Sequence, residues 1–409
     1  MENNQNSSQI KHSVLEKLAR RAIEELNSQG FMSPGHNGPY YDQETPLRNT
    51  AHWLITFSKL YQITDDLRYY TAVKQCADYL SLPKHRPGKT TFYMRDKKGK
   101  DKCNGLIGQA WVIEALAEAY LITGEQKYVQ IAREVFLVHP FDPEFGLWES
   151  VEITGSDHQI DVTFNHQLWF AAVGGILGKL IEDELILTRI RVFFECITEN
   201  CRIHENGLIK HLLPSGRWVT STMELSRISF RKILSWTLNT IRKTLGFLGF
   251  TRKSGQLDLA PKENGYHQFN LYAFALLKNA GQGQEFFNSD YFLKILIYCF
   301  SQEIRDSWRD PNHNTEPSYS DRAPSLTVNR YGFAYNAPGF EMPFIYYSFK
   351  EELSLSHKEI MEQTIEDQMK YTFDPTEFQF SKNTDDPKTL TARIYEYMRA
   401  AKQAGGHEK

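Results

Sequence analysis

The sequence predicts an all-α fold in which helical hairpins close into a barrel. Three observations lead to this prediction: a hairpin-sized internal repeat, an alternation of wholly apolar helices with amphipathic ones, and enough apolar material for one large core. Of the 409 residues, 41% are hydrophobic and 24% are charged. Chains with this balance bury a core and are not globally disordered.

The repeat is clearest between residues 54–80 and 113–137. In each segment an apolar helix ends near a threonine and a short acidic turn follows. A second helix then places apolar residues at i, i+3, i+4 and i+7. Charge and glycine in these turns are typical of the point where one helix stops and another starts. The two copies align with a constant offset of about 59 residues at three positions, Tyr61/Tyr120, Thr64/Thr123 and Tyr69/Tyr128.

Further copies begin with apolar segments at 162–182, 266–280 and 333–351, and helices at about 10–28 and 388–403 complete the set. The first helix of each pair is apolar nearly all round and must be buried, whereas the second has a charged face and lies at the surface. The pairs therefore predict an inner ring of helices inside an outer ring, an (α/α)6 barrel. A TPR-like solenoid is the disfavoured alternative, because its units are shorter and fewer of its helices are wholly apolar.

We expect a single barrel domain over residues 9–404, with a disordered N-terminus at 1–8 and a disordered tail at 405–409. Between the pairs, residues 141–163 and 201–219 share a plan of Gly-Leu, a short alternating run and a turn. This plan predicts short β-hairpins on one rim. If all inner helices start at that rim, the loops that lead into them converge on one mouth.

Charge and cysteine usage exclude several classes of function. The net charge of −3 disfavours a nucleic-acid-binding protein. The polar N-terminus lacks the layout of a signal peptide, and no apolar run reaches the roughly 18 residues of a membrane span. The five cysteines are scattered without a CxxC pair, which indicates reduced thiols and a cytoplasmic protein. The sequence has no metal or cofactor motif, so we expect neither group.

The segment 224–253 departs from the pattern, because it carries seven basic residues against one acidic residue. Apolar residues at helical spacing share the segment with them. One interpretation is a basic amphipathic helix that contacts a membrane surface or an anionic polymer. The other is one more barrel helix with a solvated basic face. We favour the second, because charge runs on helices are usually solvated faces.

Polar and aromatic residues gather at the starts of the predicted inner helices, where a pocket would be lined. Trp and Tyr stack on sugar rings, amides and histidines bind hydroxyls, and arginine pairs with a carboxylate. We therefore expect an oligosaccharide or polysaccharide as the partner. The candidate substrate-binding residues are Arg48, His52, Trp53, Gln109, His166, Trp169, His267, Arg330, Tyr335 and Glu341.

The two tryptophans of this set and Tyr335 would form the stacking surface, although aromatic residues at helical spacing also pack in cores. Arg48 or Arg330 would hold a sugar carboxylate. Glu341 lies in an apolar helix, where an unpaired carboxylate is costly. A structural ion pair is its favoured interpretation, with Arg330 or His166 as the partner.

Three stretches resemble a known superfamily: GLWES at 146–150, the loop to Asp161, and the helix start FNHQLWFAAVGGIL at 164–177. They are similar to the unsaturated glucuronyl and rhamnogalacturonyl hydrolases of the six-hairpin glycosidase-like superfamily. The resemblance implies an acid/base aspartate at Asp161, which protonates the double bond of an unsaturated uronic sugar and activates water. A second aspartate assists in that family. The resemblance implies Asp101 in this role as the nearest match, and Asp42 is the next candidate.

A second resemblance concerns IGQAWVIEAL at 107–116. It is similar to an inner helix of the N-acylglucosamine 2-epimerases, and the glucuronyl C5-epimerases share the barrel. Epimerases of this kind use two histidines on facing helices as acid and base. The resemblance implies His166 and His267 in these roles, with His52 as a third candidate.

Three functions therefore stay open. The leading expectation is a glycoside hydrolase that acts on oligosaccharides, including those with uronic acid, with Asp161 as general acid/base and Asp101 assisting. The second is a sugar epimerase or isomerase that uses paired histidines. The third is a non-catalytic polysaccharide-assembly or binding protein with a degenerate barrel.

Overall fold

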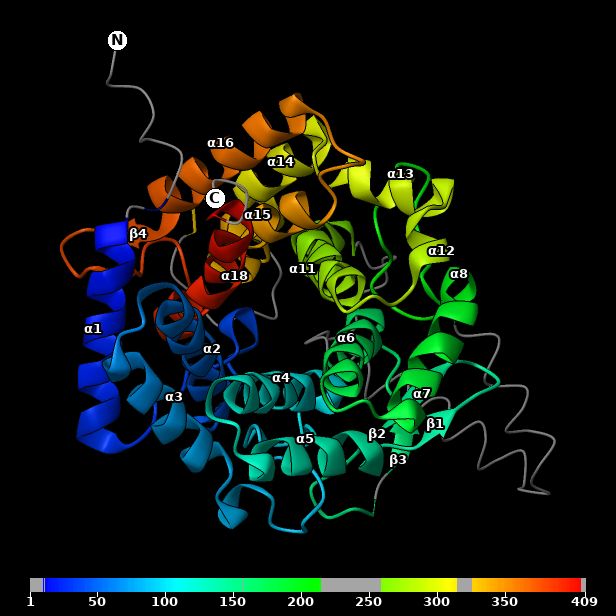
Figure 1. The fold of residues 1–409 in the computed structure, drawn as a ribbon. Helices are drawn as coiled ribbons and strands as arrows, with labels where there is room; N and C mark the ends of the chain where they lie inside the picture. The colour runs from blue at the N-terminus through cyan, green and yellow to red at the C-terminus, as the bar shows by residue number, and fades with distance from the viewer. Residues whose placement is uncertain (1–9, 11, 157, 215–258, 315–325, 406–409) are drawn as a thin grey trace.

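The computed structural model describes residues 10, 12–156, 158–214, 259–314 and 326–405. Within these residues, six helices form a closed inner ring, because each contacts the next and the last contacts the first (Figure 1). The ring consists of α2 (Leu47–Thr64), α4 (Gly105–Thr123), α6 (Phe164–Leu180), α11 (Ala260–Asn279), α15 (Pro338–Ser348) and α18 (Ile394–Gly405). The predicted (α/α)6 barrel is confirmed, and the ring closure excludes an open solenoid.

An outer layer of helices surrounds the ring (Figure 1). It consists of α1 (His12–Gln29), α3 (Leu67–Leu80), α5 (Gln126–Val138), α7 (Glu184–Glu195), the α12–α14 segment (Gln284–Phe287, Asp290–Tyr298, Gln302–Arg309) and α16 (Leu355–Thr372). The first two repeat hairpins turn at equivalent residues, Asp65 and Gly124, which both have left-handed backbones with φ of 58° and 71°. Such a residue is a common way to end a helix.

The difference between inner and outer helices follows from their sequences. Every residue of α4 from Gly105 to Ala119 is buried. By contrast, α5 buries one face, formed by Tyr128, Val129, Ala132, Val135 and Phe136. Helix α4 is long and apolar enough to cross a membrane, but 83% of the relevant window is buried inside the protein. It is therefore an inner helix of the barrel.

The rim at the starts of the inner helices carries short strands. The sequence 141–163 forms an antiparallel sheet of β1 (Phe141–Asp142), β2 (Leu147–Val151) and β3 (His158–Ile160), as predicted. The hairpin expected at 201–219 is reduced to an isolated bridge between Ile203 and Ile209 in its described part. A second small sheet pairs β4 (Phe373–Asp374) with β5 (Gln379–Phe380). The basic segment 224–253 and the expected disordered N-terminus lie outside the described residues.

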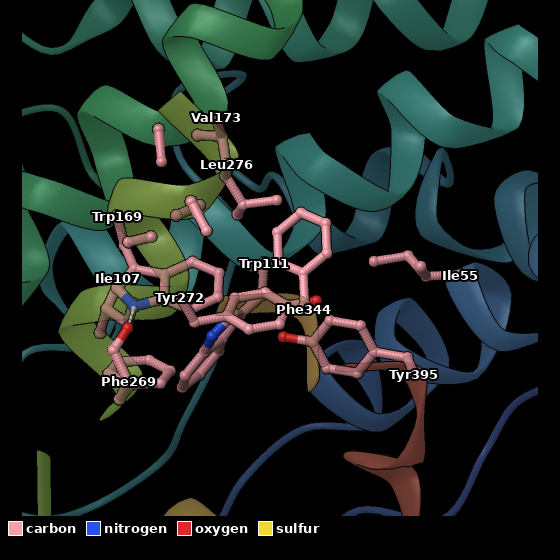
Figure 2. Close-up of a cluster of buried hydrophobic side chains, with 14 of the residues drawn as sticks. Ile55, Ile107, Trp111, Trp169, Val173, Phe269, Tyr272, Leu276, Phe344 and Tyr395 are labelled. Carbon is pink, nitrogen blue, oxygen red and sulfur yellow. Dashed lines mark hydrogen bonds between the residues drawn. The ribbon is translucent and has the colours of Figure 1, made fainter. Parts of the chain in front are cut away.

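Aromatic side chains fill the centre of the barrel (Figure 2). Trp111 of α4, Trp169 of α6, Phe269 and Tyr272 of α11, Phe344 of α15 and Tyr395 of α18 belong to one buried cluster. Trp169 stacks on Phe269 at 4.5 Å between ring centroids and on Tyr272 at 5.7 Å. The barrel is therefore plugged by an aromatic layer.

Candidate functional site

A pocket of about 500 Å³, including its solvent-filled mouth, lies above the aromatic layer. All six inner helices or the loops before them contribute to its lining, which confirms that these loops converge on one mouth. Ile107, Trp111 and Phe269 form the apolar floor. The polar lining comprises Asn37, Tyr40, Arg48, Arg95, Lys100, Asn104, Thr163, Asn165, His166, His211, Lys262, Tyr266, Tyr335, Asn336 and Arg393.

His166 is held in the pocket wall by a carboxylate. Its Nδ1 donates a hydrogen bond of 2.8 Å to Asp161 Oδ2. Because Nδ1 carries the proton of that bond, the tautomer is set and Nε2 is left for the pocket. Asp161 itself accepts two backbone N–H groups, from Leu106 at 3.1 Å and from Thr163 at 3.2 Å. Asp161 is therefore an orienting group for His166 and a cap for helix α4.

Gly105, the first residue of α4, permits this arrangement. Its φ of +55° lies in the left-handed region, and a Cβ there would lie 2.5 Å from Asp161 Oδ2 and 2.9 Å from His166 Nδ1. Only glycine avoids both the strain and the overlap. The pair of Asp161 and His166 thus packs directly on the helix terminus.

His211 is a second imidazole in the same pocket, and sequence reasoning missed it. It lies on the chain segment that pairs with the loop before α6, since Phe164 N donates to His211 O and Leu213 N donates to Val162 O. Burial, with the charges of Lys262 and His166, holds the pKa of His211 well below its ordinary value. The His211 ring is therefore neutral at pH 7, with one ring nitrogen that carries a lone pair.

Glu263, in the first turn of α11, anchors the segment that carries His211. Its Oε1 accepts the backbone N–H of His211 at 2.9 Å, and its Oε2 accepts His204 Nε2 at 2.8 Å. The signal for His211 in the sequence was slight, because the residue lies at the end of a strand-like run and not before an inner helix.

The charged side chains that line the pocket are cationic: Arg48, Arg95, Lys100, Lys262 and Arg393. No carboxylate lines it among the described residues. Carboxylates lie behind the lining, where Asp42 accepts Arg95 and Lys100, Glu44 pairs with Arg48, and Glu341 and Glu396 pair with Arg393. The exposed wall of the pocket is therefore electropositive.

Several polar atoms in the lining have no hydrogen-bond partner within the described part of the chain. They are Arg48 Nη2, Asn165 Oδ1 and Asn336 Oδ1. A buried donor or acceptor without a partner costs about 1–3 kcal/mol. One unsatisfied donor and two unsatisfied acceptors around one cavity fit a ligand with several hydroxyl groups.

Three of the predicted binding residues, Arg48, His166 and Tyr335, do line the pocket. Tyr335 donates to Asn37 Oδ1 at 2.6 Å, and Arg48 stacks on Trp111 with its Cζ 4.0 Å from the ring centroid. Tyr335, Tyr40 and Tyr266 form one aromatic wall, in which the hydroxyls of Tyr40 and Tyr266 lie 2.9 Å apart. A sugar ring could thus stack on the tyrosines of the wall or on Trp111 of the floor.

The predicted tryptophans are core residues instead. Trp53 stacks on Phe57 within α2, and Trp169 is fully buried with its Nε1 donating to Phe269 O at 3.1 Å. Neither tryptophan lines the pocket, because Trp53 packs on Phe57 and Trp169 belongs to the aromatic layer.

Two predicted histidines are also structural. His267 accepts Ile209 N at Nδ1 and donates to Ile295 O from Nε2, so both ring nitrogens are occupied away from the pocket. His52 stacks on Tyr395 at 4.6 Å and accepts Arg48 Nε at 3.3 Å. His267 lies about two turns below the mouth, whereas His166 lies in the first turn of its helix.

The other polar candidates hold the scaffold together. Gln109 is fully buried and bonds the backbone of Phe92 and Cys103. Arg330 lies 3.8 Å from Asp385, outside the pocket lining. Glu341 forms the expected buried ion pair, but its partner is Arg393 at 2.6 Å and not Arg330 or His166.

The predicted second aspartate, Asp101, also lies behind the lining. It accepts Arg95 Nη2 at 2.6 Å and the N–H of Gly105 at 2.8 Å. Burial opposes ionisation, but Arg95 and the Gly105 N–H outweigh it and hold the pKa of Asp101 below its ordinary value. The side chains of Asp101, Cys103 and Glu152 approach within 4.8 Å, yet each carboxylate is occupied by N–H donors.

Comparison with curated proteins decides the family. The chain is 36% identical over 388 residues to archaeal glycosylation protein Q of Haloferax volcanii, and the match covers 94% of this chain and 96% of the relative. The chain belongs to the family of archaeal glycosylation protein Q. A scan against protein-family models finds no match.

Solved structures extend the comparison of the fold. A cellobiose 2-epimerase from Bacillus thermoamylovorans superposes with a TM-score of 0.57 at 13% identity, covering 96% of this chain and all of that one. An unsaturated glucuronyl hydrolase specific for heparin gives 0.58 at 11% identity, covering 97% and 98%. The chain thus shares its barrel fold with these two solved enzymes.

Proposed function

We propose that this protein is a sugar epimerase or isomerase in which His166 and His211 transfer protons. The observation that supports this most directly is the presence of two imidazoles in one pocket, one neutral and one oriented by a carboxylate. The unsatisfied amide oxygens of Asn165 and Asn336 support a polyhydroxylated ligand. The likeness in fold to a cellobiose 2-epimerase agrees with the proposal.

The chemistry needs a sugar in its open-chain form, with a carbonyl next to the carbon that reacts. One imidazole removes the proton from that carbon, and the electron pair moves to the carbonyl oxygen to give an enediolate. The other imidazole, which must enter the step in its protonated form, returns a proton, and proton exchange with water then resets both rings. Return to the opposite face of the same carbon gives the epimer, and return to the former carbonyl carbon gives the isomer. The cationic lining favours the negative charge that develops on the enediolate oxygen.

Glycoside hydrolysis, the leading expectation from the sequence, receives less support from the geometry. General acid catalysis needs a carboxyl group beside the scissile bond. Asp161 accepts three N–H donors, and Asp101 is paired with Arg95, so neither presents a free carboxyl group to the cavity.

The experiment uses heavy water. The protein is incubated with mannose, cellobiose or glucuronate in D2O, and NMR follows the loss of the C2 proton signal. Mass spectrometry and a reducing-end assay run in parallel. We expect deuterium at C2 and no rise in reducing ends. His166→Gln and His211→Gln should each slow the exchange by at least about 100-fold.

The matched control is His267→Gln, a histidine of the same barrel that lies outside the pocket. Its exchange rate per folded molecule should equal that of the wild type. New reducing ends without deuterium would establish hydrolysis instead. Binding of sugars without either reaction would favour the non-catalytic alternative.

A further inference from the structure

The guanidinium of Arg48 is fixed in the pocket wall with one nitrogen unsatisfied. It lies flat on Trp111, its Nη1 donates to Asn37 Oδ1 at 2.9 Å and to Glu44 Oε1 at 3.2 Å, and its Nε donates to His52. The side chain is 1% exposed, and its Nη2 has no partner among the described residues. The ordering of this side chain is therefore complete before any ligand binds.

Arg393 is held in the same way on the other aromatic residue of the floor. Its Cζ lies 5.2 Å from the Phe269 ring centroid. Its Nε donates to Glu396, and its Nη2 donates to Glu341 and to the carbonyl of Asn336. No hydrogen bond of Arg393 Nη1 is found within the part of the chain that the structure describes. The two guanidinium groups are close enough for their like charges to repel.

The carboxylates behind these arginines do not fully offset their charge. Burial raises the pKa of Glu44 to about 7 and that of Glu396 to about 7, and it holds the pKa of Glu341 well above its ordinary value. Glu44 and Glu396 are therefore partly protonated near neutral pH. Lys100, Lys262 and Arg95 add positive charge to the same cavity.

We infer that Arg48 and Arg393 form an anion subsite at the pocket floor, which selects sugars that carry an acidic group over neutral sugars. The group is an oxyanion, either a carboxylate or a phosphate, because each has several oxygens that can accept N–H donors from Arg48 Nη2 and Arg393 Nη1 together. The inference rests on the proposed function for the identity of the ligand as a sugar. It replaces the predicted role of Arg330, which lies outside the pocket.

The subsite places the acidic group away from the reacting carbon. The arginines rest on Trp111 of α4 and Phe269 of α11, whereas His166 and His211 lie at the start of α6 and in the segment that pairs with it. A sugar held by its acidic group at the floor would extend toward the two histidines. The arginines would thus select the acidic sugar, and the histidines would transfer the protons.

Isothermal titration calorimetry tests the subsite with three probes: glucuronate, glucose 6-phosphate and glucose. We expect the wild type to bind one acidic sugar or both at least about 10-fold more tightly than glucose. Arg48→Lys keeps the charge but loses the fixed Nη2 donor, so the Kd of the preferred acidic sugar should rise about 10- to 100-fold. The Kd of glucose should change less than about 3-fold.

Arg393→Lys should give the same selective loss, and Arg330→Lys is the matched control for altering a buried arginine elsewhere. Thermal unfolding checks that each variant is folded. Equal binding of glucose and both acidic sugars by the wild type would overturn the inference, and so would an unchanged preference in Arg48→Lys. A preference for glucuronate identifies the carboxylate, and one for glucose 6-phosphate identifies the phosphate.

The outcomes also separate this inference from the proposed function. Arginine-dependent binding of an acidic sugar without deuterium uptake would refute the proton-transfer proposal and leave the subsite standing. Histidine-dependent deuterium uptake that is equally fast for neutral and acidic sugars would refute the anion subsite and leave the proton-transfer proposal standing.

Discussion

The Asp161→Asn variant tests whether the pocket works through an oriented imidazole. Asp161 accepts three N–H donors, with His166 Nδ1 and Leu106 N on Oδ2 and Thr163 N on Oδ1. An asparagine has one acceptor oxygen, so its NH2 group must face at least one of these donors. The loss of one hydrogen bond to a charged acceptor costs about 1.5–3 kcal/mol of stability.

The effect on activity depends on which way the amide turns. If its NH2 group faces His166, the imidazole accepts at Nδ1 and carries its proton on Nε2, so the basic nitrogen no longer faces the pocket. If the oxygen faces His166, the orientation is kept but the negative charge is lost. In both cases we expect the rate of deuterium exchange to fall by at least about 100-fold.

A double-variant cycle decides whether Asp161 acts through His166. Exchange rates are measured by NMR for Asp161→Asn, His166→Gln and the combination, and urea denaturation confirms folding. Because residues that act as one unit are not additive, the double variant should be no slower than His166→Gln alone. A double variant slowed by the product of both single effects would refute the reasoning. So would a fully active His166→Gln paired with an inactive Asp161→Asn, which would make Asp161 the acid itself.

Three further predictions concern the stability of the folded protein. Gly105→Ala should lose more stability in urea than Gly99→Ala, since both residues have positive φ but only at Gly105 would the Cβ meet other atoms; equal losses would contradict the packing argument. His267→Gln should lower the unfolding free energy by about 1–3 kcal/mol in urea, because two buried hydrogen bonds are broken. Because burial raises the pKa of Glu44 from 4.5 to about 7, the folded state keeps a proton that the unfolded state releases, and this contribution falls as pH rises through that window. The unfolding free energy of Glu44→Gln relative to the wild type should therefore rise by about 3 kcal/mol between pH 4.5 and 7, and a flat difference would contradict the shifted pKa.

The architecture was predictable because it depends on local patterns. Helices α4 and α5 differ in how many of their faces are apolar, and that difference is written in residues 105–138 themselves. The left-handed residues Asp65 and Gly124 end the first two inner helices at matching points of the repeat. Burial follows from such patterns because the free energy of removing apolar surface from water depends little on which partner covers it.

The sequence predicted the location of the site, but not most of the residues that form it. The starts of the inner helices do meet at one pocket, and Arg48, His166 and Tyr335 do line it. His267 was mistaken for a pocket residue because it belongs to an inner helix, but its ring bonds Ile209 and Ile295, whereas its neighbour Tyr266 lines the pocket. His211 was missed because it reaches the pocket through backbone pairing with the loop before α6.

By itself, the sequence determined which segments are helices, which of them are buried, and that their starts surround one cavity. Only the tertiary structure decided which polar groups meet there: that Asp161 orients His166, that Glu341 pairs with Arg393 from 52 residues away, and that Arg48 keeps a donor unsatisfied. Apolar burial is non-directional and tolerates many partners. Hydrogen bonds and ion pairs require two particular atoms within about 3 Å, and that distance exists only once the ring has closed.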